Sequence, residues 1–429
     1  MRLAGRVSAA IDALAAIIER HCPASDALKD WGKAHRFAGS TDRHAIGTLV
    51  YDVLRRRNSL RQRMGAETPR ALALAALHDV WGLSPDAIAA TAEEPHGPGA
   101  LTGAELAALQ RPAPVDLPLH VAGDIPEWLA PSYVRAFGLR AAEEGAALAS
   151  RAPVDLRVNT LKATRPQVLE ALARFGAVEG PWSPLAVRIS PPGPETRNAN
   201  VEAEPAHGLG WYEVQDAGSQ VAALLSGVGP GMAVADICAG AGGKTLALAA
   251  MMRNQGRLVA HDLDRFRLRP IFERLTRAGV TNCEVISAQD KGKLDAAAPF
   301  DCVVIDAPCS GSGSWRRKPD AKWRFNPKLL QQRLKEQALL LDRGFDLARP
   351  GGMVLYITCS VLPEENTDQI AGFLARQPGA VIVPYREQWG HAIEGDAPAS
   401  ADGAETTLLL TPARHGTDGF FAAVIRKMA

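Results

Sequence analysis

The sequence predicts an α/β protein in which a doubly wound, mostly parallel sheet forms the carboxyl-terminal half and helices form the amino-terminal part. From about residue 206 onward, short apolar stretches alternate with helical patterns, which is typical of buried parallel strands joined by crossover helices. The first ~90 residues instead repeat apolar side chains at the spacing of one helix face. Because 429 residues exceed the size of one ordinary domain, we expect two or three domains.

The composition is that of a globular protein with a packed core, at 47% hydrophobic and 22% charged residues. A net charge of +1 does not indicate a polyanionic partner, so a nucleic-acid surface has to come from local clusters of charge. The six cysteines include no Cys-x-x-Cys pair, which argues against zinc or a thioredoxin motif and favours a reducing, cytoplasmic setting. Asp12 interrupts the first apolar stretch, and no apolar run is long enough to span a membrane.

The amino-terminal part is predicted to contain an amphipathic helix, with one apolar face made by Ile46, Leu49, Val50, Val53 and Leu54. Residues 55–63, which follow it, hold five arginines and no acid. They are either a solvated helix end or a phosphate contact, and the pattern leaves both open. Residues 91–125 are rich in Gly, Pro and Ala, which predicts a linker or an irregular connection.

A mixed pattern over residues 126–205 predicts a small α+β unit, with a strand at 156–159 and a helix at 166–175. The main sheet is expected over residues 206–429. Its predicted strands are 234–238, 258–260, 302–305 and 353–357. The expected domains are therefore 1–125, 126–205 and 206–429.

A glycine-rich turn follows the first strand of the predicted sheet, where residues 236–245 read Asp-Ile-Cys-Ala-Gly-Ala-Gly-Gly-Lys-Thr. Glycines let a backbone approach a ligand closely, and a helix N-terminus offers free N–H groups to an anion. The spacing matches neither the dinucleotide fingerprint nor a P-loop, and a tight turn without a ligand is the alternative. Asp262, at the end of the next strand, could accept hydrogen bonds from ribose hydroxyls or cap a helix, a role that Asp264 could also take.

Two cysteines follow two further strands of this sheet. Residues 306–311 read Asp-Ala-Pro-Cys-Ser-Gly and contain Cys309, and residues 356–360 read Tyr-Ile-Thr-Cys-Ser and contain Cys359. Since ligands bind at the carboxyl ends of parallel strands, both cysteines are expected to open onto one cleft. A single cysteine in such a place is more often a small buried hydrophobe, but two of them, with Asp306 beside one, favour a chemical role.

Together with residues 318–323 (Lys-Pro-Asp-Ala-Lys-Trp) and 363–366 (Pro-Glu-Glu-Asn), these blocks resemble the RsmB/Nop2/NSUN family of RNA cytosine-5 methyltransferases, and most of all its bacterial 16S ribosomal RNA enzymes. The resemblance covers nearly the whole chain and implies a Rossmann-like class I methyltransferase domain. The amino-terminal part resembles the NusB-like helical domain of those enzymes. That likeness favours a phosphate contact for the arginines and ribosomal RNA as the substrate.

The resemblance makes Cys359 the nucleophile that adds to carbon 6 of cytosine, and Cys309 the residue that assists release of the methylated RNA. Carbon 5 is a poor nucleophile, and thiolate addition at carbon 6 turns the ring into an enamine that reacts at carbon 5. Free cysteine is mostly protonated at neutral pH, so the site must activate it. Asp306 would bind the cytosine edge, where an acid assists the addition, and would face the methyl donor.

The cofactor that the family implies is S-adenosylmethionine. Asp262 would hold its ribose, and Asp290 would lie on the adenine side. The family usually has proline at the position of Ala241 and alanine at that of Gly240, so the loop is expected to be looser before it binds a ligand. The predicted methionine-binding loop consists of Cys238, Ala239, Gly240, Ala241, Gly242, Gly243 and Lys244.

RNA is the expected partner, with no membrane, no metal and a monomeric protein. Arg157 and Asn159 match the family's RNA-facing segment before the catalytic strands, and Gln215 and Asp216 match a block just ahead of those strands. Residues 315–335 hold eight Lys or Arg residues interleaved with three aromatic residues, which predicts RNA contact, although the tryptophans could equally be core. The predicted contacts in this segment are Arg316, Arg317, Lys318 and Lys322.

Other functions stay open at this level. A tRNA cytosine-5 methyltransferase would carry the same catalytic blocks. A DNA enzyme typically uses the cysteine of a Pro-Cys pair as its nucleophile, which here is Cys309, whereas the block around Cys359 favours the RNA arrangement. A non-catalytic ribosome-assembly factor is favoured only by Ala241 and opposed by the intact cysteines, Asp306 and Lys244.

Overall fold

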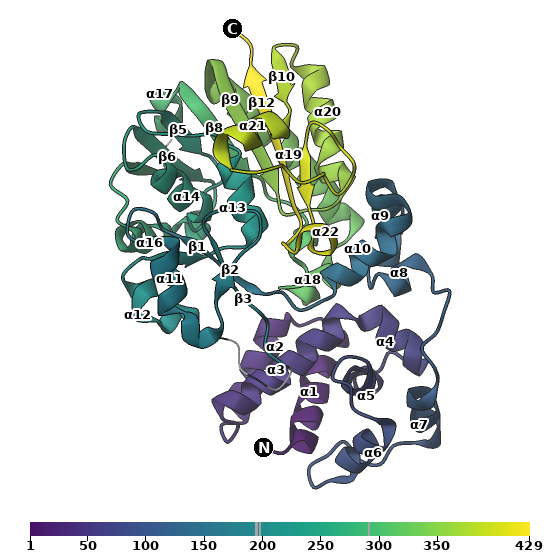
Figure 1. Ribbon diagram of the computed structural model, residues 1–429. Helices are drawn as coiled ribbons and strands as arrows, with labels where there is room; N and C mark the ends of the chain where they lie inside the picture. The colour runs from purple at the N-terminus through teal and green to yellow at the C-terminus, as the bar shows by residue number, and fades with distance from the viewer. Residues whose placement is uncertain (194–195, 197–198, 291) are drawn as a thin grey trace.

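The computed structural model describes residues 1–193, 196, 199–290 and 292–429. A helical part built from the first residues lies below a larger part that contains the main sheet, and a small sheet lies beside the junction (Figure 1). The predicted α/β class is confirmed.

Seven helices form the core of the amino-terminal part, and α5 is buried on almost every side. The predicted apolar face on α3 is confirmed, because all five of its residues are buried. The helices are α1 (Leu3–Ile18), α2 (Ala24–Ala34), α3 (Ser40–Arg55), α4 (Arg57–Met64), α5 (Pro69–Asp79), α6 (Pro85–Glu93) and α7 (Gly103–Gln110).

The predicted linker over residues 91–125 is wrong in part, because α7 lies inside it. The Thr102 side chain accepts a hydrogen bond from the Glu105 backbone N–H, and Glu105 accepts one from the Thr102 N–H in return. This capping box stabilises the start of a helix that the surrounding glycines and prolines conceal in the composition. The short α8 (Leu119–Ala122), α9 (Ala130–Phe137) and α10 (Ala141–Leu148) then lead toward the sheets.

The small sheet is antiparallel, with the strand order β2-β3-β1-β4. The predicted strand and helix of this region are present with slightly shifted ends, as β1 (Val154–Val158) and α11 (Arg165–Ala171), the latter extended by a 3-10 turn. The other strands are β2 (Val178–Glu179), β3 (Ala186–Ile189) and β4 (Tyr212–Val214).

The main sheet has the order β10-β12-β9-β8-β5-β6-β7, with β11 paired to β12. The strands from β9 to β7 are parallel, whereas β12 is antiparallel to β9 and β10. All four predicted strands are present. The strands are β5 (Ala233–Asp236), β6 (Arg257–Asp262), β7 (Cys283–Ser287), β8 (Phe300–Asp306), β9 (Ala348–Thr358), β10 (Ala380–Val383), β11 (Leu408–Leu410) and β12 (Phe420–Lys427).

Helices cover both faces of this sheet, as a doubly wound fold requires. One face packs on α19 and α20, where Phe345 and Phe373 join the core, and the other packs on α13, α14 and α21. The helices of this part are α12 (Pro205–Gly208), α13 (Ala217–Leu224), α14 (Gly243–Met251), α15 (Arg265–Leu268), α16 (Ile271–Ala278), α17 (Lys293–Ala297), α18 (Pro319–Arg324), α19 (Pro327–Leu347), α20 (Thr367–Arg376), α21 (Tyr385–Ala392) and α22 (Pro412–His415). None of the helices described combines the length and the apolar character that crossing a bilayer requires.

Candidate active site

The carboxyl ends of four adjacent strands carry the candidate catalytic residues. In the order β9-β8-β5-β6, the strands lead into Cys359, the loop from Asp306 to Cys309, the glycine-rich loop, and Asp262. Parallel strands place these ends at one edge of the sheet, so the residues gather although they are far apart in the sequence. The sheet therefore brings the two cysteine blocks together as expected.

The two cysteine sulfurs are in contact, with 3.4 Å between Cys309 Sγ and Cys359 Sγ. Both cysteines are half-buried. The Gly313 N–H donates to the Cys359 carbonyl at 3.0 Å, which holds one cysteine loop against the other. The hydrogen bond between Cys309 and Cys359, with Cys309 as the donor, and the burial of the thiol raise the pKa of Cys309 well above its ordinary value. Cys309 therefore keeps its proton and can donate it to the sulfur of Cys359.

The buried carboxyl group of Glu365 holds the first cysteine loop in place through hydrogen bonds. It accepts hydrogen bonds from the Ser310 N–H at 2.8 Å and from Gln337 Nε2 at 3.0 Å, and Gln337 also donates to the Pro308 carbonyl at 3.0 Å. Burial raises the pKa of Glu365. The neighbouring Asn366 donates to the Ser360 carbonyl at 2.9 Å and so supports the second loop.

The motif at residues 363–366 has no role that the sequence alone assigns, and nothing in the sequence marks Gln337 as part of a site. The structure gives Glu365 and Asn366 the role of positioning the two cysteine loops. The position of the motif is a signal, because it begins only four residues after Cys359. Gln337 lies on α19 and carried no such signal.

Lys244 links the glycine-rich loop to the acid of the first cysteine block. Its Nζ donates to Asp306 Oδ2 at 3.1 Å and to Ser219 Oγ at 2.7 Å, and it lies 5.2 Å from the centre of the Phe420 ring. Lys244 is buried, whereas the Asp306 side chain is 34% exposed. A ligand in the cleft can therefore reach the Asp306 carboxylate, while Lys244 donates to that carboxylate from its buried side.

The glycine-rich loop has the backbone conformation that its glycines allow. Gly240 and Gly242 have φ values of +48° and +89°, and a Cβ at Gly242 would lie 2.6 Å from a carbon of Ile271. The Gly240 N–H donates to Asp262 Oδ2 at 2.9 Å, so the acid after β6 holds the loop after β5. Ala241 does not interrupt this arrangement, because its carbonyl accepts from Arg274 at 2.8 Å.

The two acids after β6 take different roles. Asp264 is the N-cap of α15, accepting from the Phe266 N–H at 2.8 Å, so Asp262 does not cap the helix. Each Asp262 oxygen accepts one backbone N–H, from Gly240 at 2.9 Å and from Asp264 at 2.8 Å. A carboxylate has about four acceptor positions, so two remain for a ligand.

A cavity of about 570 Å³ opens beside Asp262. Cys238 and Pro308 line it from the strand ends, and Leu339, Leu340 and Arg343 line it from α19. The sequence reasoning missed these α19 residues, since nothing in a long amphipathic helix marks the side chains that border a ligand.

Asp290 is held in the turn after β7 and does not appear among the described residues that line this cavity. Its carboxylate accepts from Ser287 Oγ at 2.9 Å and from Lys293 Nζ at 2.8 Å. The hydrogen bond from Lys293 is the main reason that the pKa of Asp290 falls to about 2.

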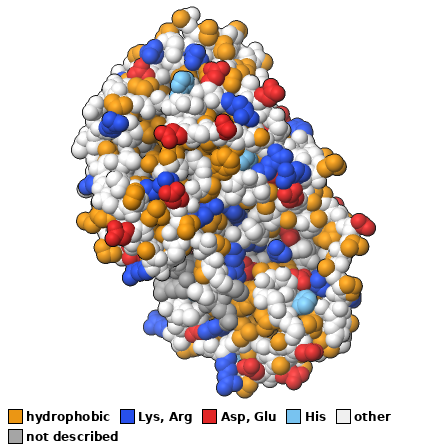
Figure 2. Space-filling model, in the orientation of Figure 1, with side chains coloured by type: hydrophobic (Ala, Val, Ile, Leu, Met, Phe, Trp, Pro, Cys, Tyr) orange, Lys and Arg blue, Asp and Glu red, His pale blue; other side chains and the backbone are white. Residues whose placement is uncertain are grey.

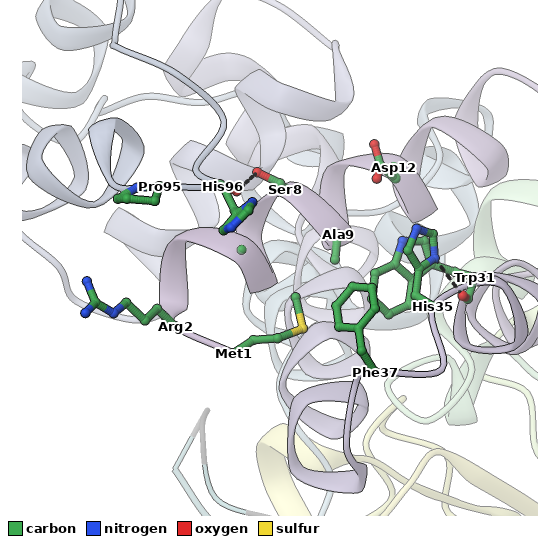
Figure 3. Close-up of a pocket in the computed structure, with 11 residues that line it drawn as sticks. Met1, Arg2, Ser8, Ala9, Asp12, Trp31, His35, Phe37, Pro95 and His96 are labelled. Atoms are coloured by element: carbon green, nitrogen blue, oxygen red, sulfur yellow. Dashed lines mark hydrogen bonds between the residues drawn. The ribbon is translucent and has the colours of Figure 1, made fainter.

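A second cavity of similar size, about 550 Å³, lies in the helical part. Figure 3 shows Trp31, His35 and Phe37 gathered along one wall of it, with the Trp31 and His35 rings stacked 4.3 Å apart. No cysteine lines it and no main-sheet residue reaches it among those described, so its size alone does not make it the active site.

The predicted RNA-facing pair, Arg157 and Asn159, is buried, which corrects that prediction. Arg157 Nε donates to Gln215 Oε1 at 2.6 Å, and burial lowers the pKa of Arg157 to about 10. Asn159 Nδ2 donates to the carbonyls of Gly210 and Ala278 at 2.8 and 2.9 Å. These side chains join the small sheet to the catalytic part rather than face a solvent-borne ligand.

The basic segment after the first cysteine loop is also less exposed than its charge suggests. Arg316 is 3% exposed and pairs with Asp418, and Arg317 pairs with Asp418 and with Asp216 at 3.0 Å. Burial and the neighbouring Asp418 raise the pKa of Asp216 to about 7. Both acids lie far from this segment in the sequence, so counting charges within the segment missed them.

Lys322 caps the carboxyl-terminal end of α3, a helix of the amino-terminal part. Its buried Nζ donates to the carbonyls of Arg55 and Asp124 at 2.8 and 2.6 Å, and Trp323 Nε1 donates to the Leu54 carbonyl at 2.6 Å. The last carbonyls of a helix have no partner within it, so α18 caps the end of α3. Burial lowers the pKa of Lys322 to about 8.

Of the four cations predicted to contact RNA in this segment, only Lys318 is exposed. Trp315 is core at 2% exposure, which bears out the alternative that the tryptophans pack inside. No group of three or more His, Cys, Asp or Glu side chains in the described residues could hold a metal ion.

Comparison with known families identifies two segments of the chain. Residues 227–426 match the model of the 16S rRNA methyltransferase RsmB/F family, and residues 125–195 match the ferredoxin-like domain of RsmF/B-like methyltransferases. The two matches cover the main sheet and most of the small one.

Curated relatives carry consistent names. A "probable ribosomal RNA small subunit methyltransferase B" of Synechocystis is 30% identical over 70% of this chain and 66% of its own length. Ribosomal RNA small subunit methyltransferase B of Klebsiella pneumoniae is 36% identical over 60% of this chain and 59% of its own length, and that of Salmonella typhi is 37% identical over 54% and 53%. The chain thus spans about half to two thirds of the length of the relatives it matches.

Solved structures share the fold. A methyltransferase homologue from Pyrococcus horikoshii is 29% identical, with a TM-score of 0.59 over 72% of this chain and 98% of its own. NSun6 from the same organism, solved with SFG, is 20% identical with a TM-score of 0.61 over 71% and 98%, and PH0851 is 24% identical with a TM-score of 0.74 over 100% and 99%. The chain belongs to the RsmB/F family of methyltransferases, whose cofactor is S-adenosylmethionine.

Proposed function

We propose that this protein transfers a methyl group from S-adenosylmethionine to carbon 5 of a cytosine in RNA, and that the RNA is 16S ribosomal RNA. The observation that carries the proposal is the pair of cysteine sulfurs, 3.4 Å apart, beside Asp306 at the strand ends. The names of the relatives support ribosomal RNA as the substrate.

Cys238 and Asp262 line the 570 Å³ cavity and fit the cofactor, whereas Ala239 to Lys244 of the glycine-rich loop are not among the described residues of that lining. Asp262 keeps two acceptor positions for ribose hydroxyls, and the loop from Cys238 to Lys244 would hold the methionine end at a helix N-terminus. The bound cofactor supplies an electrophilic methyl group. Asp290 follows β7, the strand next to β6, and we keep it on the adenine side of the site.

The cysteine pair supports a division of chemical roles. Cys309 keeps its proton and lies 3.4 Å from Cys359 Sγ, so we give Cys359 the role of the sulfur that bonds to carbon 6 of the cytosine. Asp306 would hydrogen-bond the cytosine edge and stabilise the ring as carbon 5 becomes nucleophilic. After methyl transfer, a base from solvent takes the carbon-5 proton, the electrons of that bond form the double bond between carbons 5 and 6, and the bond between carbon 6 and Cys359 Sγ breaks. Cys309 lies 3.4 Å from the leaving sulfur and can donate its proton to it.

We also propose that the helical region, residues 1–125, is an RNA-binding domain of the NusB type. The target cytosine must leave its stack to reach a thiol between two strands, so some other part of the protein has to hold the surrounding RNA. The helical region contacts the segment that follows the Cys309 loop, because Arg55 hydrogen-bonds to Arg316 and to Lys322 of that segment. It is therefore well placed to hold the surrounding RNA.

The test incubates wild type, Cys359→Ser and Cys309→Ser with tritiated S-adenosylmethionine and bacterial 16S RNA or tRNA. Bisulfite sequencing maps the products, and denaturing gels detect covalent protein–RNA adducts. We expect methylcytosine from wild type, none from Cys359→Ser, and a trapped adduct with Cys309→Ser. Cys22→Ser, a half-buried cysteine of the helical part, is the control and should methylate normally.

Each alternative has its own outcome in this test. Activity retained by Cys359→Ser would make Cys309 the nucleophile. Activity on tRNA alone would replace ribosomal RNA as the substrate. A wild-type protein that binds RNA but methylates none would favour the non-catalytic assembly factor.

A further inference from the structure

A third cavity, of about 450 Å³, lies between α3 of the helical part and the catalytic part. Among its described lining residues there is no Asp or Glu. Figure 2 shows Lys and Arg side chains along the junction of the two parts. Five arginines from three separate stretches of the chain line it: Arg43, Arg55, Arg151, Arg316 and Arg317.

Carboxylates hold most of these arginines without lining the cavity. The buried Asp52 accepts from Arg55 Nη1 and from Arg151 Nε, both at 2.9 Å. Asp216 and Asp418 hold the two arginines of the catalytic part. Five guanidinium groups thus face three acids, and the excess positive charge remains at the cavity.

One guanidinium nitrogen has an unmet need for an acceptor. Arg316 Nη2 is buried, has no hydrogen-bond partner and lies 3.9 Å from an oxygen of Asp216. A buried donor without an acceptor costs free energy. This end of the Arg316 guanidinium is therefore not neutralised by a hydrogen-bonded carboxylate.

We infer that this cavity binds a backbone phosphate of the RNA substrate between the helical and catalytic parts, an inference that rests on the proposed function. Guanidinium groups match the oxygens of a phosphate in pairs, and five of them around one cavity suit one or two adjacent phosphodiester groups of the RNA backbone. The arginines are fixed in place before binding, because Asp52, Asp216 and Asp418 hold them.

The position of the cavity explains why a phosphate there would matter. Arg316 and Arg317 follow the 3-10 turn of Ser312–Ser314, and Gly313 in that turn donates to the Cys359 carbonyl. Arg55 Nε donates to the Arg316 carbonyl at 2.8 Å, so the helical part contacts the same segment. A bound phosphate would set the path of the RNA strand next to the cysteine pair.

The test adds one negative charge to the cavity and leaves the five arginines and their carboxylate partners in place; both variants lose the contact between Thr48 Oγ1 and His44 Nε2 at 3.4 Å. Thr48, on α3, lines the cavity and is half-buried, so Thr48→Glu places a carboxylate among the arginines, and Thr48→Gln is the uncharged control of the same size. Fluorescence anisotropy with a labelled 16S RNA fragment gives Kd over a range of salt concentrations. Thermal melts show whether both variants fold alike.

We expect Thr48→Glu to weaken RNA binding about tenfold and to reduce the slope of log Kd against log salt by about one, as loss of one phosphate contact predicts. Thr48→Gln should stay within about twofold of wild type. Equal RNA affinities for the two variants overturn the inference. So does weakened binding of inorganic phosphate by Thr48→Glu with RNA affinity unchanged, because the cavity would then serve a free anion.

The binding assay separates this inference from the proposed function. If wild type methylates RNA while Thr48→Glu and Thr48→Gln bind it equally, the phosphate site fails and the enzyme stands. If no RNA is methylated but the two variants still differ in RNA affinity, the phosphate site stands and the enzymatic proposal fails.

Discussion

The two cysteine loops and the basic segment that follows the first of them are neighbours in the chain, yet their polar residues serve different ends. In the loops, residues from separate strands meet at one sheet edge and remain half-exposed, as Cys309, Cys359 and Asp306 do. In the segment, Arg316 and Lys322 turn inward to acids and carbonyls from distant parts of the chain. The position of a residue at a strand end therefore predicts its role better than its charge does.

The largest effect should come from Asp306, one of the half-exposed residues of the cysteine loops. Asp306→Asn should reduce kcat about 1,000-fold, because an amide cannot supply the acid or the charge at the cytosine edge. Methyl transfer to RNA at saturating cofactor measures it. Asp301→Asn changes the same residue type at the other end of β8, and its activity should stay within a few-fold of wild type. Equal losses in the two variants would contradict the role of Asp306.

Asp418→Asn changes a buried acid, so it should lower the free energy of unfolding rather than the rate of methyl transfer. The change leaves Arg316 and Arg317 with one carboxylate fewer, and a broken buried ion pair typically costs about 3 kcal/mol. Urea unfolding measures this loss. Asp368→Asn breaks the exposed pair with Arg135 and should cost less than about 1 kcal/mol. A loss for Asp418→Asn no larger than that of the control would show that the basic segment is solvated after all.

A pH series tests the burial of Lys322. Its pKa is lowered to about 8 in the folded protein, against an ordinary value of 10.5, so the unfolded chain takes up the proton first as pH falls. Stability from this group is therefore present above pH 10.5 and lost as pH falls through 8. Urea unfolding of wild type and Lys322→Met between pH 7.5 and 10 measures this. The free energy of unfolding of wild type should rise relative to that of the variant as pH rises. Parallel curves would mean that Lys322 titrates as an exposed lysine.

The smallest effect is expected at Lys318, the exposed member of the predicted RNA contacts. Lys318→Ala should change the free energy of unfolding by less than about 0.5 kcal/mol, as at most surface positions. If it touches a phosphate, RNA affinity should fall a few-fold and the salt slope by about one. An unchanged salt slope would remove Lys318 from the RNA surface.

The sequence was sufficient for the elements with strong patterns and for the residues tied to them. The four strands it predicted are buried apolar runs, and the cysteines and Asp306 follow from where those runs end. The strand β7 was missed because it lies at the sheet edge, where polar residues such as Glu284 interrupt the apolar run. The strand β12 was missed because a continuous apolar run cannot be assigned to strand or helix from periodicity alone.

The fate of the polar side chains was harder to predict. Whether Arg157 or Arg316 faces solvent depends on acceptors such as Gln215 and Asp418, and no local pattern links residues that lie so far apart in sequence. The domain boundaries and the roles of the site residues stay predictions until the variants are measured. The helix α7 could have been predicted from the sequence, since Thr102 and Glu105 have the residue types and the spacing of a capping box.

The insertion of β12 between β9 and β10 has a consequence for how the molecule is made. The ribosome synthesises β12 after every other strand of this sheet, so until it emerges the apolar edge of β9 has no partner on that side. Open strand edges of this kind pair readily with other chains. Asp418, just ahead of β12, arrives at the same moment, so until then Arg316 and Arg317 lack one of their two buried carboxylate partners, Asp216 and Asp418. A nascent chain therefore passes through an interval in which it is both prone to aggregate and unable to hold RNA in the geometry of the finished site.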